Sequence, residues 1–227
     1  SPFPPELSAN ALKELTKLGV QVRNHHKVKQ VNADSVIVTH EDQAMTIRAQ
    51  TIIWAAGVQA SPLGRKLAER TGAQTDRGGR VIVEPDLTLA DYPEIFVIGD
   101  MACYPHQGEH PLPGVAPVAM QQGKYAAKTI VNRLQNKPTE PFRYSDPGSL
   151  ATIGRSKAVA VLGSWKFTGF LAWSLWLIVH LMQLIQFENR VLVLMQWSWA
   201  YSTFNHSARL ITGEDYRQEE LSELTES

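Results

Sequence analysis

The sequence predicts an α/β fold followed by C-terminal helices that associate with a membrane. Short, nearly continuous apolar runs are typical of strands buried on both faces, and helical stretches with apolar residues at every third or fourth position lie between them. The third observation is a long apolar stretch, residues 167–204, that holds most of the tryptophans. The chain has 227 residues, of which 44% are hydrophobic and 19% charged, as in ordinary globular proteins.

The charge balance argues against a nucleic-acid partner. Lys plus Arg and Asp plus Glu each number 22, whereas phosphate binding needs a clustered basic surface. The single cysteine, Cys103, allows no internal disulfide and is interpreted as a small core residue. His106 and His110 lie in a Pro/Gly-rich loop without a Cys or carboxylate cluster, so no metal site is predicted.

The first part of the chain predicts one helix and several short strands. Apolar residues at helical spacing predict a helix over residues 7–18, which ends at Gly19. The last strand ends in Ala55-Ala56-Gly57, where small residues let the chain turn and pass close to another group. A hairpin is predicted around residues 40–43. The predicted strands cover residues 20–22, 28–31, 36–39, 45–47 and 51–54.

The middle of the chain predicts buried strands and a long helix. Short strands are expected over residues 80–83 and 95–98, after a short helix, and a longer helix over about 117–134. Beyond residue 147 the composition changes, and two further strands are expected around residues 154–157.

Gly99-Asp100, directly after a buried strand, is the first candidate site. Ligands of open α/β sheets bind at the carboxyl ends of strands. There a glycine lets a ligand approach the backbone, and Asp100 can accept hydrogen bonds from sugar hydroxyls. Alternatively, Asp100 only caps the following segment.

The start of the long helix is the second candidate site. Pro117 suits the first helical position, and the N–H groups of Val118 and Ala119 are expected to point outward. The positive end of the helix would then favour an electron-rich or anionic group. The alternative is an ordinary capped helix.

The C-terminal stretch predicts two helices lying along a membrane. The first apolar run, residues 169–187, approaches the roughly 20 residues that span a bilayer, but the second, 191–204, is shorter and more polar. Glu188-Asn189-Arg190 is expected to separate the two helices. A buried helical hairpin and a dimer interface are the alternatives. Residues 213–227 are expected to form an acidic, solvated tail.

Three segments carry a resemblance to a known family. Residues 87–100 resemble the segment of two-dinucleotide-fold flavoproteins whose Asp holds the ribityl chain of FAD, and residues 51–57 resemble an earlier segment of that group. Ala116, Ala119 and Gln121 match an Ala-Gln-x-Ala-x-Gln type motif of the type II NADH dehydrogenases, found where flavin meets quinone. Pro117 stands where the first Gln of that motif is usual.

The resemblance implies an enzyme that passes electrons from NADH through FAD to a membrane quinone without pumping protons. The redox chemistry would belong to the cofactor, and no residue would act as an acid or base. The quinone contacts would be Gln121 and Pro117. The residues expected to contact FAD are Ala56, Gly57, Gly99, Asp100, Ala116, Val118 and Ala119.

The resemblance also implies a partial two-dinucleotide-binding (FAD/NAD(P)) fold. The chain contains no Gly-x-Gly-x-x-Gly, which that family uses once for each dinucleotide, and it begins without Met. We therefore expect a C-terminal half that alone holds FAD weakly and is inactive. The expected domains are a remnant of the NADH-binding domain (1–54), the C-terminal part of the FAD-binding domain (55–142) and a membrane-docking region (143–227).

The expected location is the cytoplasmic face of the cell membrane, with peripheral attachment. The expected partners are the quinone, the membrane surface and a second copy in a homodimer. Two alternative functions are a sulfide:quinone oxidoreductase-like flavoprotein and a catalytically inactive membrane-docking fragment.

Overall fold

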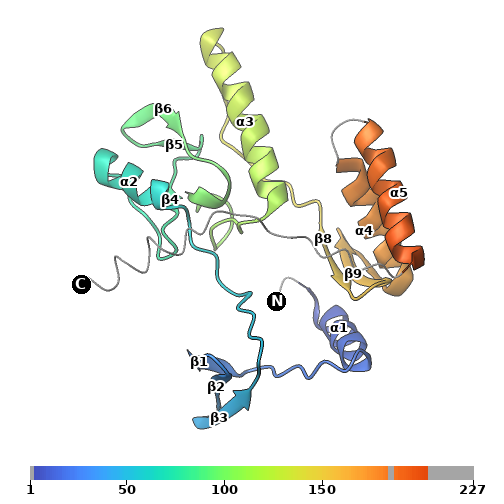
Figure 1. The fold of residues 1–227 in the computed structure, drawn as a ribbon. Coiled ribbons are helices and arrows are strands. Elements are labelled where there is room, and N and C mark those ends of the chain that lie inside the picture. Colours follow the sequence, from blue (N-terminus) through green and yellow to red (C-terminus); the bar gives the residue numbers. More distant parts are fainter. Residues whose placement is uncertain (1–2, 184–186, 204–227) are drawn as a thin grey trace. The chain divides into compact units, whose positions relative to one another are not determined.

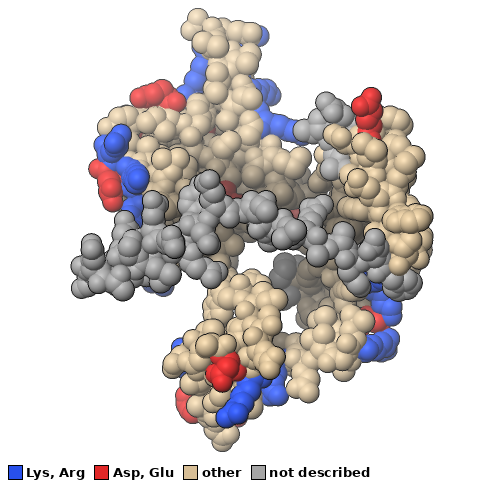
Figure 2. Space-filling model, in the orientation of Figure 1, with Lys and Arg blue, Asp and Glu red and all other residues tan. Residues whose placement is uncertain are grey.

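The computed structural model describes residues 3–183 and 187–203 and has two compact units (Figure 1). The first unit comprises residues 1–149 and 160–166, and the second comprises residues 150–159 and 167–227. On the face drawn in Figure 2, basic and acidic side chains are interspersed among uncharged ones.

The first helix, α1 (Pro5–Lys17), begins two residues before its predicted start. Pro5 fits the first helical position because its missing N–H would be unsatisfied there anyway. The chain leaves the helix through Gly19, whose φ of +83° confirms the predicted stop. The strand predicted over residues 20–22 is wrong: these residues lie in an irregular, exposed connection. A three-residue apolar run needs a neighbouring strand, and none of the described strands pairs with it.

A three-stranded antiparallel sheet follows, in the order β1 (Lys27–Val31), β2 (Ser35–His40) and β3 (Gln43–Arg48). The predicted hairpin is confirmed, since His40 pairs with Gln43 across a two-residue turn. The turn residues Glu41 and Asp42 have φ values of +46° and +64°. Positive φ at both positions is the turn geometry that matches the twist of paired strands.

The strand predicted over residues 51–54 is not formed. Residues 51–61 carry neither helix nor strand. The apolar side chains here stand in solvent, with Ile53 82%, Trp54 62% and Val58 85% exposed. An apolar strand is stable only with neighbours on its edges and cover on its faces, and the described part of the chain pairs no strand with it.

The short helix is confirmed as α2 (Pro62–Thr71), which Ser61 caps by accepting a hydrogen bond from the Leu63 N–H. Beyond it, β4 (Val81–Ile82) pairs in parallel with β7 (Ala102–Cys103), and β5 (Thr88–Leu89) pairs antiparallel with β6 (Tyr92–Phe96).

The expectation of strands buried on both faces is wrong for β6, whose residues are all exposed or half-buried. The buried apolar residues instead lie at strand ends and in loops. They form one core cluster: Val81, Val83, Leu87, Leu89, Val97, Ala102, Tyr104 and Phe142. Cys103 is buried, as predicted.

The long helix is confirmed as α3 (Ala116–Leu134). Its buried side chains recur at helical spacing, on Val118, Gln122, Ala126 and Thr129. Two of these four are polar, which the apolar pattern of the sequence did not suggest.

The C-terminal part begins with a sheet of order β10-β9-β8, from β8 (Ser149–Ile153), β9 (Lys157–Leu162) and β10 (Trp165–Thr168). The first two strands were predicted; the third was not. Two helices follow, α4 (Gly169–Gln183) and α5 (Phe187–Thr203). The expected break at residues 188–190 is wrong, because these residues form the first turn of α5. Helix boundaries follow backbone hydrogen bonds, and a short polar run on an exposed face does not interrupt them.

Within the second unit, Arg155 ties the β8–β9 turn to the end of α5. Its Nη2 donates to the carbonyl oxygens of Ala200, at 3.0 Å, and Tyr201, and its guanidinium lies 5.0 Å from the Tyr201 ring centroid. A cation at the carboxyl end of a helix meets carbonyls without intrahelical partners and the negative end of the dipole. No helix of the described residues is long and apolar enough to cross a membrane. The predicted acidic tail lies outside the described residues.

Candidate functional site

The Gly99–Asp100 turn follows β6 after two residues, Val97 and Ile98, which the sequence prediction had placed in the strand. Gly99 has a φ of +68°, in the left-handed region that favours glycine, and opens the one-turn helix η1 (Gly99–Met101). The Asp100 side chain is exposed, and among the described residues it accepts no hydrogen bond. This geometry gives no support to Asp100 as a simple capping residue and leaves its carboxylate available to a ligand.

Two other residues, Gly114 and Ala119, lie close to this turn, at distances where an added Cβ would make ordinary van der Waals contact. A Cβ on Gly114 would lie 3.4 Å from Asp100 Oδ1, and a Cβ on Gly99 would lie 3.6 Å from Ala119 Cβ. The turn, Gly114 and the start of α3 therefore form one small neighbourhood with a single exposed carboxylate. The carboxylate accepts hydrogen bonds, so this small-residue neighbourhood could bind a ligand rich in hydroxyl groups.

The start of α3 differs from the sequence prediction. The N–H groups of Val118 and Ala119 do not point outward, because both donate to the carbonyl oxygen of Val115, at 3.0 and 3.3 Å. The Val118 side chain is buried. The Ala119 bond is the ordinary first i→i−4 bond of the helix, and the Val118 bond is a tighter i→i−3 bond that uses an N–H which an ideal helix start leaves free. What remains for a ligand is the positive end of the helix and the small side chains of Ala116 and Ala119.

Gln121, the predicted quinone contact, has both ends of its amide engaged. Its Nε2 donates to the Ser145 carbonyl oxygen at 2.8 Å, and its Oε1 accepts from the Ser145 N–H at 3.0 Å. Gln107 forms the same reciprocal pair with Tyr144, at 2.8 Å in both directions. Two amide side chains therefore hold one backbone segment by imitating strand pairing.

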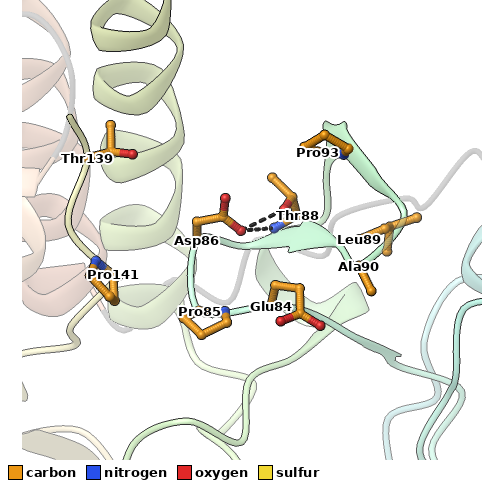
Figure 3. A pocket seen from close by; sticks show the side chains of 9 residues that line it. All are labelled: Glu84, Pro85, Asp86, Thr88, Leu89, Ala90, Pro93, Thr139 and Pro141. Carbon is orange, nitrogen blue, oxygen red and sulfur yellow. Dashed lines mark hydrogen bonds between the residues drawn. The ribbon is translucent and has the colours of Figure 1, made fainter. Parts of the chain in front are cut away.

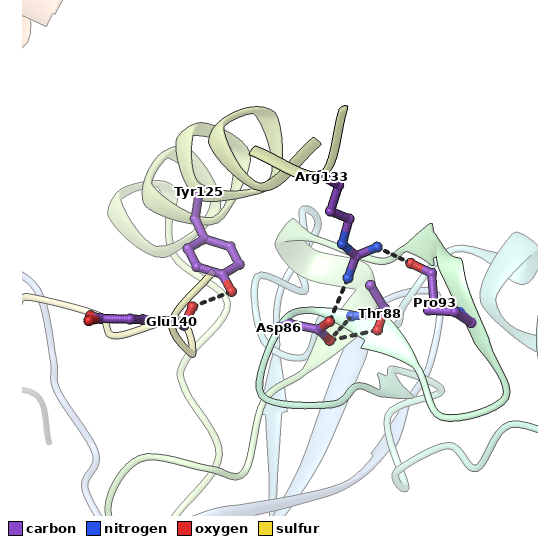
Figure 4. Close-up of polar contacts among 6 residues, drawn as sticks. All are labelled: Asp86, Thr88, Pro93, Tyr125, Arg133 and Glu140. Carbon is purple, nitrogen blue, oxygen red and sulfur yellow. Dashed lines mark hydrogen bonds and ion pairs between the residues drawn. The ribbon is translucent and has the colours of Figure 1, made fainter. Parts of the chain in front are cut away.

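This segment, residues 140–145, is called the strap below. Tyr104 Oη donates to the Phe142 carbonyl oxygen at 2.6 Å. Figure 4 shows the second bond, in which Tyr125 Oη donates to the Glu140 carbonyl oxygen at 2.7 Å. The Phe142 N–H donates to the Pro85 carbonyl oxygen at 2.8 Å. Burial raises the pKa of the Tyr104 and Tyr125 phenols, so both stay protonated as donors.

A polar network lies at the far end of α3 (Figure 4). Arg133 Nη2 is 2.7 Å from Asp86 Oδ2 and its Nη1 donates to the Pro93 carbonyl, while Asp86 Oδ1 accepts from the Thr88 hydroxyl at 2.6 Å. The neighbouring cavity of about 500 Å³ opens beside this network (Figure 3). Because Asp86 is engaged on both oxygens, we interpret the network as structural.

Ala56 and Gly57 lie in the extended stretch after β3. Gly57 has a φ of +83°, and a Cβ there would meet nothing within 4 Å. The structure thus brings together Gly99, Asp100 and the start of α3, and leaves Ala56 and Gly57 in open surroundings.

The second unit presents a groove between α4 and α5 of about 270 Å³, lined largely by aromatic and aliphatic side chains. Its serines contribute little polarity, since the hydroxyls of Ser198 and Ser202 donate to carbonyls of their own helix at 2.7 and 2.8 Å. Other large apolar side chains on these helices are more than half exposed: Phe170, Leu171, Ile178, Met182, Phe187, Leu192, Met195 and Trp199.

Comparisons with known proteins agree with the sequence resemblance. The pyridine nucleotide-disulphide oxidoreductase model matches residues 1–123, and the NDH2 C-terminal domain model matches residues 147–201. The type II NADH:quinone oxidoreductase Ndh of Mycobacterium tuberculosis is 39% identical over 98% of this chain and 49% of its own length. The chain thus spans about half the length of this relative.

Two solved structures are similar in fold. NDH2 from Plasmodium falciparum, in complex with NADH, has a TM-score of 0.76 at 17% identity over 87% of this chain and 55% of that one. Sulfide:quinone oxidoreductase from Aquifex aeolicus has a TM-score of 0.56 at 15% identity over 95% of this chain and 48% of that one. At such identities the likeness concerns the fold.

Proposed function

The chain belongs to the pyridine nucleotide-disulphide oxidoreductase family, and we propose that the protein containing it is a type II NADH:quinone oxidoreductase. The observation that carries this proposal is the 39% identity to such an enzyme along 98% of the chain. The match of the C-terminal region to the NDH2 C-terminal domain favours this enzyme over other members of the family.

We propose that the cofactor is FAD and that this chain supplies the part of its site around the ribityl chain. Asp100 would accept hydrogen bonds from ribityl hydroxyls, and Gly99 and Gly114 would leave room for the chain of the cofactor. Ala116 and Ala119 would allow close approach at the positive end of α3, which stabilises negative charge. The stretch with Ala56 and Gly57 would pass close to the cofactor from another direction.

Bound FAD would supply the redox chemistry, taking a hydride from NADH and giving two electrons to the quinone. The residues of this chain bind and orient, and none needs to transfer a proton. Pro117 is proposed as an apolar quinone contact. Gln121 could contact the quinone only if its two hydrogen bonds with Ser145 broke. We therefore propose that this contact forms only after its side chain has moved away from Ser145.

The α4–α5 pair is proposed to lie along the cytoplasmic membrane face. Its exposed apolar side chains would enter the boundary between headgroups and acyl chains, where burial of apolar area favours binding. The indole rings of Trp176 and Trp197 stack at 5.8 Å, and aromatic side chains of this kind suit the interface.

Sulfide:quinone oxidoreductase activity is less favoured, because it would need redox cysteines and this chain has one cysteine. Redox cysteines react as exposed thiolates of lowered pKa. Cys103 is buried in β7, and burial raises its pKa, so its thiol is held in the unreactive form.

The test is the electron donor and acceptor of the natural full-length polypeptide that contains this chain. Reconstituted in liposomes with FAD, it should oxidise NADH and reduce quinone, and sulfide should not replace NADH. Removing residues from 165 onward should release the protein from liposomes and lower quinone reduction more than NADH oxidation by a soluble acceptor. Sulfide-dependent quinone reduction without NADH oxidation would overturn the proposal.

A further inference from the structure

Two polar side chains are buried along the inner face of α3, although the rest of that face is apolar. Gln122 and Thr129 are each 1% exposed. A buried polar group is costly unless it is hydrogen-bonded, so each position has a partner to satisfy. Thr129 is hydrogen-bonded to the Tyr125 phenol, within its own helix. Gln122 reaches out of the helix to a different part of the chain.

The partner of Gln122 is the backbone of the candidate site. The N–H of Gly99 donates to Gln122 Oε1 at 2.7 Å, across 23 positions of sequence. Gly99 is the left-handed residue at which the chain turns from β6 into η1, and Asp100 comes next. The orientation of the Gly99 peptide therefore sets where the Asp100 carboxylate lies.

The neutral amide suits this position. Its oxygen accepts the Gly99 N–H without placing a charge in a buried site, where desolvation would be expensive. The neighbouring Gln121 holds the strap, so consecutive glutamines connect the start of α3 to two segments. Ala119, one turn earlier, is close enough that a Cβ on Gly99 would contact its side chain at 3.6 Å, so the start of α3 lies beside the turn.

We propose that Gln122 is a positioning residue for cofactor binding: by holding the Gly99 N–H, it fixes the Gly99–Asp100 turn so that the Asp100 carboxylate is presented to ligand hydroxyls. This inference rests on the proposed function, in which those hydroxyls belong to the ribityl chain of FAD. Gln122 itself touches no ligand and acts through Gly99.

The experiment uses the natural full-length polypeptide with Gln122→Met, which keeps the length of the side chain and removes the acceptor. Thr129→Val is the matched control, because it removes a buried hydrogen bond on the same helix face without touching Gly99. Gln122→Glu retains an oxygen that can accept from Gly99, because a carboxyl buried at this position avoids the cost of its charge by taking up a proton. Two readouts are measured: hydrogen exchange of the Gly99 amide without FAD, and the FAD dissociation constant from flavin fluorescence.

Gln122→Met should speed Gly99 exchange and raise the FAD dissociation constant by about tenfold each, the scale of one lost hydrogen bond. Gln122→Glu should restore much of both, and Thr129→Val should leave both unchanged while lowering the thermal midpoint.

The inference would be overturned if Gln122→Met kept the Gly99 exchange rate and the FAD affinity of wild type. It would also be overturned if Thr129→Val changed both readouts as much as Gln122→Met does, because that would indicate general destabilisation. If Gln122→Met does not fold, equal readouts in wild type and Gln122→Glu support the inference, and loss in a folded Gln122→Glu contradicts it. If wild type binds no FAD, the proposed function and the cofactor role of Gln122 both fail. If wild type binds FAD and Gln122→Met binds it equally well, the inference fails and the proposed function stands.

Discussion

The strap gives the sharpest stability prediction, because two tyrosines hold it in similar ways at different depths. Tyr104 is 2% exposed and donates to the carbonyl oxygen of Phe142, a residue that is 3% exposed. In Tyr104→Phe that carbonyl oxygen loses its donor with little access to water. The bond from Tyr125 to Glu140 is exposed, so in Tyr125→Phe water can replace the lost donor of the strap. The Thr129 hydroxyl also loses its partner in that variant, but Thr129 lies on α3 and not on the strap.

A buried polar group left without its partner costs about 1–3 kcal/mol, whereas an exposed hydrogen bond contributes about 1 kcal/mol or less. Tyr104→Phe should therefore raise the equilibrium constant for opening of the strap roughly 5- to 150-fold, at 1.4 kcal/mol per factor of ten. Hydrogen exchange of the Phe142 amide, which donates to Pro85, measures this opening. Tyr125→Phe should change it several-fold at most. Equal effects of the two substitutions, or a larger one from Tyr125→Phe, would refute the reasoning.

Three further predictions concern backbone strain and pH. Gly148→Ala should lower the urea midpoint by more than Gly163→Ala, since a Cβ at Gly148 would lie 2.2 Å from the Val161 carbonyl oxygen and one at Gly163 meets nothing within 4 Å. Burial would raise the pKa of Asp76, but hydrogen bonds from Arg80 and Gly78 and the Arg80 charge outweigh it and hold the pKa below 3.8. The folded state thus favours the carboxylate. The stability that this preference contributes should be complete above pH 3.8 and lost as the pH falls through the lowered pKa. The loss of stability on acidification should be smaller in Asp76→Asn. The raised pKa of Tyr104, from an ordinary 10.0, predicts the opposite window: stability complete below pH 10.0 and lost in alkali, followed by phenolate absorbance.

The sequence predicted those elements whose signals are local. Gly19 ends α1, the turn at Glu41-Asp42 sets the hairpin, and Pro117 lies in the first turn of α3. Each depends on the conformational preference of a few residues. The Gly99–Asp100 turn was located for the same reason, because an apolar run followed by Gly-Asp is visible in one short segment.

The elements that were missed depend on distant partners. The run at residues 51–54 is apolar enough for a strand, but a strand also needs neighbours, which the described chain does not give it. Gln122 was missed because only its burial at helical spacing with Val118 and Ala126 could have marked it, and its partner Gly99 lies 23 positions away. The hydrogen bond from Val118 to Val115 follows from how tightly α3 begins, which composition does not determine.

The most direct test of the account is FAD retention by Asp100→Ala in the natural full-length polypeptide. Asp91→Ala is the matched control, because Asp91 is another exposed carboxylate of the same unit, outside the candidate site. A lost charge-assisted hydrogen bond costs roughly 1.5–3 kcal/mol, so the FAD dissociation constant should rise about 10- to 100-fold in Asp100→Ala and stay unchanged in Asp91→Ala. Unchanged FAD affinity in a folded Asp100→Ala protein would contradict the assignment of this turn to the cofactor.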